Sequence, residues 1–239
     1  ATGTGKGAAS VGFLQAGTGM VARTLESKAR DTVHASDRGL IGDGVTDETA
    51  GIASILAASG GKQLQLQQSK TYALASATGM AIADNTTIRA NGSKFKRLTA
   101  KVGAVTDSDY NIVVGSNVDI DVLEVEAVGG LGDIGGVIIS GSNVRIGKLR
   151  VVAGNAGSAG NGLAWNALRV GPNSGTARNV SIGVIEVENW DRAVVLQNID
   201  GLEVGFIRGT TYRQGLQELA HPWRLPLRHV VQRDGCGGG

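Results

Sequence analysis

A short apolar pattern that recurs along the chain restricts the possible folds more than any other feature of this sequence. It reads Asn-Val-x-Ile at residues 117–120, 143–146 and 179–182, Gly-Leu-x-Val at 201–204 and Asn-Thr-x-Ile at 85–88. In the later copies, further apolar residues follow at the same offsets. Because the spacing is constant within the copies and variable between them, the pattern predicts a solenoid of stacked coils with loops of different length.

The residues between 62 and 210 have the composition of β-strands. Val, Ile and Leu alternate with polar residues in short runs that Gly, Asn and Ser interrupt. The chain holds 38 glycines and only three prolines without a Gly-X-Y period, which indicates many tight turns and excludes a collagen-like triple helix. Long runs of helix-forming residues are absent from this part of the sequence, so a helical-repeat solenoid is disfavoured. We therefore predict an all-β chain that forms a parallel β-helix of about five coils.

Stacking the copies in register predicts two columns of side chains on the outside of the solenoid. One column alternates in charge: Glu124, Arg150, Glu186 and Arg208. The other repeats a side-chain amide: Asn85, Asn117, Asn143 and Asn179. Neighbouring strands lie ~4.8 Å apart, so opposite charges attract weakly across this distance and stacked amides can hydrogen-bond along the axis.

A helix is predicted just before the repeat, over residues 46–59. Thr46 is the expected N-cap, and acidic side chains in the first turn suit the positive end of the helix dipole. Three apolar residues share one face: Ile52, Ile55 and Leu56. A short amphipathic helix of this kind would cover the open end of the solenoid, where an unpaired strand edge invites aggregation.

The segment at residues 37–50 reads Asp-Arg-Gly-Leu-Ile-Gly-Asp-Gly-Val-Thr-Asp-Glu-Thr-Ala. It resembles the Gly-Asp-Gly-x-Thr-Asp entry motif of the pectate-lyase-like β-helix superfamily, which includes bacteriophage tailspikes and polysaccharide lyases. Residues 13–28 resemble the neck that precedes the β-helix in many tailspikes. The sequence departs from the family pattern at Arg38, where an aromatic residue is usual, and at 65–72, where a Pro-x-Gly-x-Tyr turn is common. The resemblance implies a right-handed parallel β-helix with an N-terminal capping helix and a short neck.

This resemblance implies that the chain has three segments. Residues 1–35 are expected to form a flexible lead and a neck for attachment, and residues 36–212 the β-helix with its capping helix. Residues 213–239 are expected to form an irregular C-terminal segment. The composition of that segment differs from that of the repeat, so it is either a plug that ends the solenoid or sequence foreign to it.

The function implied by the resemblance is that of a phage tailspike or its tail-proximal part, a virion structural protein for tail attachment and host-surface recognition. The expected partners are two further copies in a homotrimer, phage tail or adaptor proteins, and host surface polysaccharide. The neck carries the residues expected at the trimer axis: Phe13, Leu14, Val21 and Leu25. Isolated helices under ~12–15 residues are marginal in water, so this short stretch needs an external apolar surface to bury them.

The alternative function is a cell-surface polysaccharide depolymerase, acting as a hydrolase or a lyase. Hydrolysis needs two carboxylates ~5–9 Å apart. Glu188 and Asp191 are candidates, because like Glu126 and Asp133 they lack a basic residue in register. They flank Trp190, which either stacks on a sugar ring or packs in the core. Aromatic residues make up only 4% of the chain, which argues against a long sugar-binding groove. A secreted pectin-type lyase is a third reading, disfavoured by the neck-like segment.

Charge and composition exclude several other classes of protein. The net charge of +2 gives no strong attraction to nucleic acid or to anionic membranes, and no apolar run of about 18 residues predicts membrane insertion. The single cysteine, Cys236, excludes internal disulfides and a Cys-rich zinc site. The histidines are isolated from one another: His34, His221 and His229. Asp43 and Asp47 are assigned to turn and cap roles, so neither a metal ion nor another cofactor is expected.

Overall fold

The computed structural model of this chain describes residues 7, 11–13, 21–76, 78–99, 110–127, 135–153 and 166–219. The side chains of residues 13, 191 and 210–219 are outside this description. Several residues singled out in the sequence analysis lie outside the described residues altogether: Leu14, Asp133, His221, His229 and Cys236. The predicted irregular segment 213–239 is described only up to residue 219, and this part continues the strand Ile199–Leu219, so the last coil extends beyond the predicted boundary at residue 212.

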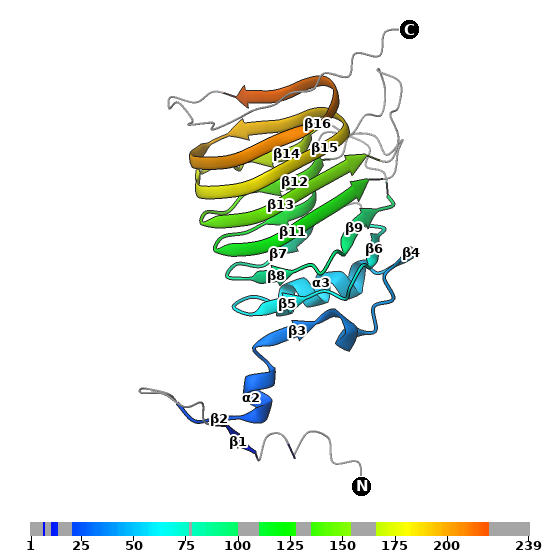
Figure 1. The fold of residues 1–239 in the computed structure, drawn as a ribbon, viewed down its shortest axis with the longest axis vertical. Coiled ribbons are helices and arrows are strands. Elements are labelled where there is room, and N and C mark those ends of the chain that lie inside the picture. The colour runs from blue at the N-terminus through cyan, green and yellow to red at the C-terminus, as the bar shows by residue number, and fades with distance from the viewer. Residues whose placement is uncertain are drawn as a thin grey trace.

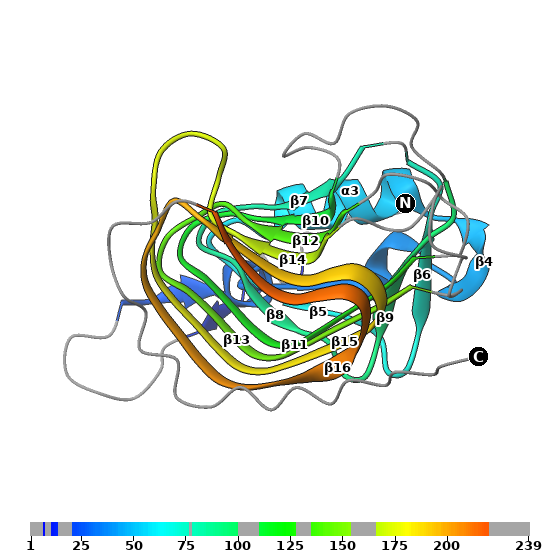
Figure 2. The ribbon, with the colours of Figure 1, turned by 90° about the horizontal axis from the view of Figure 1, so that it is seen from above.

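Parallel strands in curled sheets make an all-β, solenoid-like fold (Figure 1), and successive coils place strands on three faces in a fixed order (Figure 2). The first face stacks β3 (Thr32–His34), β5 (Gln63–Gln65), β8 (Thr87–Arg89), β11 (Val118–Ala127), β13 (Val144–Ala153), β15 (Ala177–Gln197) and β16 (Ile199–Leu219). The second stacks β4 (Asp43–Asp47), β6 (Thr71–Leu74) and β9 (Lys94–Arg97) below the later parts of β11, β13, β15 and β16. The third stacks β7 (Met80–Ile82), β10 (Tyr110–Val114), β12 (Gly135–Ile139) and β14 (Asn166–Val170) below the last parts of β15 and β16.

The stack of strands begins earlier than the sequence pattern indicates. β3 pairs in parallel with β5, so the sheet starts at Thr32, inside the predicted segment 1–35. Within the described residues the first face holds seven strands, β3, β5, β8, β11, β13, β15 and β16, where about five coils were predicted from the repeat. The strands β3 and β5 are short and lack the Asn-Val-x-Ile pattern, which is why the repeat does not reveal them.

The interior of the solenoid is filled by the apolar residues of the repeat. Val118, Val144 and Val180 lie in register on successive coils, and each is only 1% exposed. Side chains from all three faces belong to one continuous hydrophobic cluster. Each fully buried Val or Ile contributes about 1.5–3 kcal/mol relative to an exposed one, so every coil is stabilised by its own inward residues and by those of its neighbours.

The predicted capping helix is present as α3 (Thr49–Ala58). It takes the place of a strand on the third face of the first coil, where it packs beside β7 (Figure 2). The predicted apolar face is confirmed, since three of its side chains are fully buried: Ile52, Ile55 and Leu56. The helix thereby covers the N-terminal edge of the third face.

The start of α3 differs from the prediction, because Thr46 is not its N-cap. The Thr46 hydroxyl donates to the carboxylate of Asp43 at 2.7 Å and belongs to the preceding turn. Asp47 holds the first turn instead, accepting hydrogen bonds from the backbone N–H of Thr49 at 3.0 Å and from its hydroxyl at 2.6 Å. Asp43 in turn accepts three hydrogen bonds, two from Thr46 and one from Val45, and these bonds lower its pKa to about 2. Asp43 and Asp47 therefore have the turn and cap roles that the sequence predicted.

The predicted amide column is confirmed at the corner that precedes the first face. The Nδ2 atoms of Asn117, Asn143 and Asn179 donate to the Oδ1 atoms of Asn85, Asn117 and Asn143 at 3.1, 2.9 and 3.0 Å. All four residues have a left-handed backbone with φ between 55° and 60°, and Gly201 continues the column at φ 79°. Asn is one of the few non-glycine residues that tolerate this conformation, so one residue type serves both the turn and the ladder.

A second ladder, which the sequence pattern does not predict, joins the residues just before the asparagines. Asp84 Oδ1 accepts the backbone N–H of Ser116 at 2.7 Å. Ser116 Oγ accepts that of Ser142 at 3.1 Å, and Ser142 Oγ accepts that of Arg178 at 3.0 Å. Each side chain thus satisfies a backbone donor of the next coil, and the corner is bonded along the axis by two adjacent columns.

A glycine column marks the bend between the first and second faces. A Cβ atom on Gly147 or Gly205 would lie 2.5 Å from the carbonyl oxygen of Asp121 or Gly183, one coil below. Such a contact is too close for a side chain, so the bend selects glycine at these positions. At the bottom of the column Asp121 accepts the backbone N–H of Ala90 at 2.9 Å and so ties β11 to the end of β8.

The amide ladder leads to a prediction for two substitutions of Asn143. Asn143→Ala removes its two ladder hydrogen bonds and leaves an ordinary side chain in a left-handed backbone, so we expect a loss of about 2–4 kcal/mol in the free energy of unfolding. Asn143→Gly is the matched control, because it loses the same bonds without backbone strain, and its loss should be smaller by about 1–2 kcal/mol. Urea denaturation of both variants measures the difference, and equal losses would contradict the role given to the backbone conformation.

Candidate functional site

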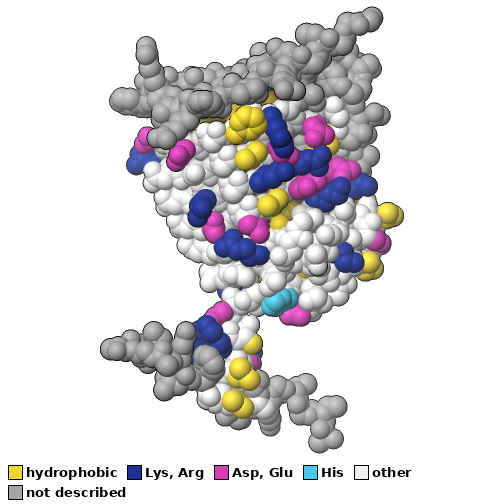
Figure 3. All heavy atoms as spheres, in the orientation of Figure 1, with side chains coloured by type: hydrophobic (Ala, Val, Ile, Leu, Met, Phe, Trp, Pro, Cys, Tyr) yellow, Lys and Arg dark blue, Asp and Glu magenta, His cyan; other side chains and the backbone are white. Residues whose placement is uncertain are grey.

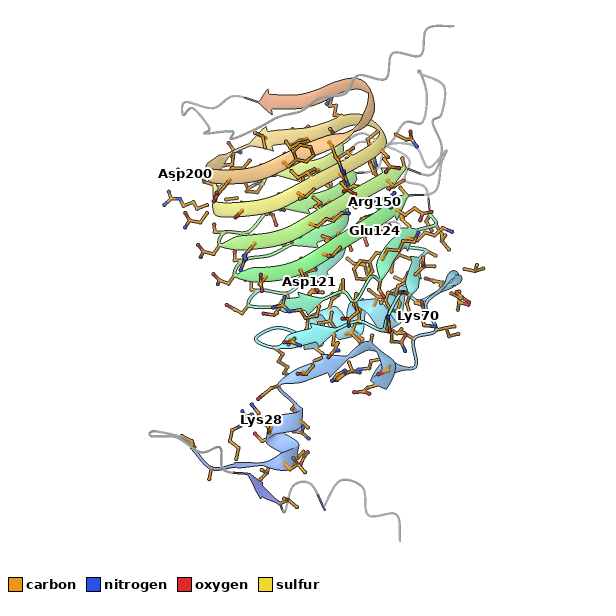
Figure 4. All side chains as sticks on the ribbon, in the orientation of Figure 1. Lys28, Lys70, Asp121, Glu124, Arg150 and Asp200 are labelled. Atoms are coloured by element: carbon orange, nitrogen blue, oxygen red, sulfur yellow. The ribbon has the colours of Figure 1, made fainter. Side chains whose placement is uncertain are left out.

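The predicted charge column is confirmed on the outside of the second face. Glu124, Arg150, Glu186 and Arg208 are register partners on β11, β13, β15 and β16. Arg150 Nη1 lies 2.6 Å from Glu124 Oε1, and Figure 4 shows these two residues on neighbouring strands. Arg150 Nε lies 3.7 Å from Glu186 Oε2. Arg208 forms a further ion pair with Glu186. Charged side chains of both signs gather on this part of the surface (Figure 3).

Two more residues turn the column into a charge network. Lys148 Nζ lies 3.0 Å from Glu186 Oε2, and Arg150 Nη2 lies 3.1 Å from Glu188 Oε1. The side chain of Glu186 is only 10% exposed and is surrounded by the cations of Lys148, Arg150 and Arg208. We call these six residues the charge network: Glu124, Lys148, Arg150, Glu186, Glu188 and Arg208.

Glu188 and Glu126, for which no basic residue in register was expected, both have a basic partner. Glu188 pairs with Arg150, and Glu126 pairs with Lys94 at 2.6 Å. Both partners lie on an adjacent strand but two residues before the position directly opposite the glutamate. Long Arg and Lys side chains reach such diagonal neighbours. The residue directly opposite Glu126 on β9 is also basic, Lys96, so the expectation for Glu126 was wrong for the position in register as well.

The electrostatics of Glu186 favour its ionised form. Burial raises its pKa, but hydrogen bonds and attraction from Arg208 and Lys148 outweigh that effect, and the net pKa lies below the ordinary value for glutamate. A general acid at neutral pH needs a raised pKa. Glu186 is therefore placed to hold cations together and is poorly suited to donate a proton.

Trp190 packs in the core, which is one of the two positions that the sequence allowed for it. Its side chain is fully buried in the hydrophobic cluster, so its ring is not available to stack on a sugar, and the glycan-binding expectation is corrected. Glu186 and Glu188 point outward, so regular strand alternation would point the side chain of Trp190 outward as well. Asn189 has a left-handed backbone at φ 63°, and the pairing of β15 with β16 shifts register around Trp190. The side chain of Asp191 lies outside the described residues.

The segment before the first coil forms a small unit of its own (Figure 1). β1 (Gly12–Phe13) pairs antiparallel with β2 (Arg23–Thr24), and α2 (Leu25–Ala29) follows directly. Arg23 holds the unit together: its two Nη atoms lie 2.9 and 2.7 Å from the carboxylate oxygens of Asp31, and it also donates to Ser27. The hydrogen bond from Arg23 is the main reason why the pKa of Asp31 is lowered to about 2. We call the described residues 11–13 and 21–31 the N-terminal unit.

The apolar side chains that the structure describes in the N-terminal unit are exposed to solvent. Val21 is 78% exposed, Leu25 44% and Val11 51%. Phe13 lies in β1, with its side chain outside the described residues, and Leu14 is not described. Val21 and Leu25 are among the residues predicted for attachment, whereas Val11 is not. The backbone N–H of Leu25 donates to the carbonyl of Val11 at 2.8 Å, which brings these two residues together.

Among the described residues, no cluster of three or more His, Cys, Asp or Glu side chains is arranged to hold a metal ion. No helix in the described part of the chain is long and apolar enough to cross a bilayer. Comparison of the chain with protein-family models, with curated proteins and with solved structures finds no match.

The charge network leads to a prediction for stability in acid. Because the pKa of folded Glu186 is lowered, its contribution is present above the unfolded value of about 4.3 and is lost as the pH falls through the folded value. Arg208→Met removes a cation that lowers this pKa, so the loss should be smaller and should be complete at a higher pH than in the unmodified chain. Urea unfolding between pH 3 and pH 7 measures this shift.

The matched control for this experiment is Arg178→Met. Arg178 pairs with Asp200 at 3.7 Å, but both side chains are more than half exposed, so the pair contributes at most ~1 kcal/mol. The pH dependence of unfolding should be unchanged in the control. Identical profiles for Arg208→Met and the unmodified chain would contradict the role assigned to Glu186.

Proposed function

We propose that this chain is a virion structural protein, the tail-proximal part of a bacteriophage tailspike. In this proposal it forms a homotrimer, binds phage tail or adaptor proteins through residues 1–35 and carries a right-handed parallel β-helix toward polysaccharide on the host surface. The observation that carries the proposal is the exposure of Val11, Val21 and Leu25 on the N-terminal unit.

The described residues of the N-terminal unit are linked by polar contacts, and their apolar side chains are exposed. The ion pair between Arg23 and Asp31 and the cap of α2, where Thr24 accepts the N–H of Ser27 at 3.0 Å, hold its backbone in place. The apolar side chains contribute nothing to that internal framework, and exposing them to water is unfavourable. A unit built in this way suits contact with an external apolar surface, and two further copies around an axis would supply one.

The solenoid supports the proposal because it needs no partner for its own core. Its inward residues are buried within one chain, from Ile52 on α3 to Ile207 on β16. The cyclic order of the three faces from coil to coil supports the β-helix in particular. Oligomer contacts are therefore expected at the N-terminal unit, which leaves the sides of the solenoid available to contact a host glycan.

The competing function is a polysaccharide depolymerase, and one observation favours it. Glu186 and Glu188 lie two residues apart on the same side of β15, or about 6.6 Å along the strand, which is within the range of carboxylate separations in inverting glycosidases. Against this reading, Arg150 contacts both carboxylates and the pKa of Glu186 is lowered. The structural role is therefore the better-supported function.

The trimer proposal predicts the effect of charged residues in the N-terminal unit. We expect the full chain to be a trimer at micromolar concentration in light scattering, and the double variant Val21→Asp/Leu25→Asp to be a monomer. Both side chains are exposed in the single chain, so the variant should retain the fold of the solenoid, which circular dichroism would verify.

Val45→Asp is the matched control, because Val45 is 76% exposed but lies in β4, outside the N-terminal unit. This control should remain a trimer. A monomeric full chain would refute the proposal, and a trimer that survives the double substitution would place the contact elsewhere.

The structural role also predicts that the purified chain does not cleave glycans. Incubation with purified bacterial surface polysaccharides should release no reducing ends above the background of the polysaccharide alone. Release that is lost in a Glu188→Gln and Asp191→Asn variant would instead establish the depolymerase function. Glu203→Gln, on the outside of the first face, is the matched control for that variant.

A further inference from the structure

A polar pocket lies outside the first coils, where strands of the first face end and the chain turns toward the second face. Its volume is about 530 Å³, within the range of ~300–1,000 Å³ typical of small-molecule sites. Residues from three successive coils line it: His34, Ser36, Gln65, Leu66, Gln67, Gln68 and Asn91. We call it the amide pocket.

The lining of the amide pocket is polar and carries no fixed charge. Of its described lining residues none is an acid, a lysine or an arginine, and the one apolar member, Leu66, is only 2% exposed. The nearby cation Arg89 is paired with Asp119 at 3.1 Å. Side-chain amides offer both donors and acceptors, and Ser36 and His34 add further hydrogen-bonding groups.

The wall of the pocket is held in place by hydrogen bonds behind it. Asn91 Nδ2 donates to the carbonyl of Leu66 at 2.7 Å, and the backbone N–H of Leu66 donates to the carbonyl of Arg89 at 3.0 Å. The backbone N–H of Gln67 donates to Tyr72 Oη at 3.1 Å, and Ser93 Oγ donates to the carbonyl of Gln67. A ligand would therefore meet a rigid backbone, which lowers the entropy lost on binding.

Two amides of the pocket remain available to a ligand. Gln65 is the register partner of His34 on the outward side of the first face, and Gln68 is exposed in the following loop. Within the described part of the chain, neither glutamine side chain makes a hydrogen bond, whereas the amides of Asn91 and Gln67 already contact the wall.

We propose that the amide pocket binds a neutral sugar unit, with the side chains of Gln65 and Gln68 hydrogen-bonding to its hydroxyl groups. Adjacent hydroxyls of a sugar are both donors and acceptors, and so are the two amides. A phosphate or carboxylate would find no cation in the lining, and an apolar ligand would bury these amides without partners. This inference depends on the proposed host-surface role in one respect only, which is that the role identifies the host glycan as the source of the sugar.

Titration of the isotope-labelled full chain with glucose, galactose and N-acetylglucosamine tests this site. At least one of these sugars should shift the side-chain amide resonances of Gln65 and Gln68, and Gln65→Ala/Gln68→Ala should weaken its binding by about tenfold or more. Glucuronate and inorganic phosphate should bind no more tightly than the neutral sugars.

Gln63→Ala is the matched control, because Gln63 lies on the outward side of β5 but does not line the pocket. It should leave sugar binding unchanged. The single variant Gln68→Ala, at an exposed loop position, repeats the test without altering a strand. Absence of any shift with the three sugars, equal binding in the double variant, or tighter binding of phosphate would overturn the inference. None of these outcomes depends on the trimer, whose own test uses residues of the N-terminal unit.

Discussion

The left-handed corner at the asparagine column is the constraint on which the rest of the stack depends. Coils share one register only if each turns at the same point, and the backbone conformation of Asn117, Asn143 and Asn179 sets that point. The amide ladder and the serine ladder beside it then tie each corner to the next. With the corners aligned, the apolar residues of the repeat meet inside and the charges of the second face meet outside.

Much of this arrangement could be predicted from the sequence, because it depends on contacts that repeat from coil to coil. The column of Glu124, Arg150 and Glu186 followed from stacking the copies in register, and so did the amide ladder. The sequence left the core and the surface open for Trp190, and a local feature decides between them, since the left-handed backbone of Asn189 reverses the strand alternation. An irregularity that occurs only once does not appear in the repeat pattern and so could not be predicted from it.

The candidate sites were harder to predict because they depend on neighbours that are not directly opposite. Glu188 meets Arg150 along a diagonal, and the amide pocket combines Gln65 with a loop residue and with Asn91 from the next coil. The first coils also lack the repeat pattern, so nothing in the sequence alone placed His34 beside Gln65. Side-chain reach and loop path decide such contacts, and neither follows from the spacing of apolar residues.

The position of α3 gives the molecule a direction of growth. The helix occupies the third face of the first coil, so strands can be added there only above it, on the side of β7 and β10. During synthesis the N-terminal end leaves the ribosome first, and α3 can cover the third face at that end before the later coils exist. Each new coil can then pair with the edge of the coil made just before it. The chain can therefore fold vectorially, with each finished coil as the template for the next.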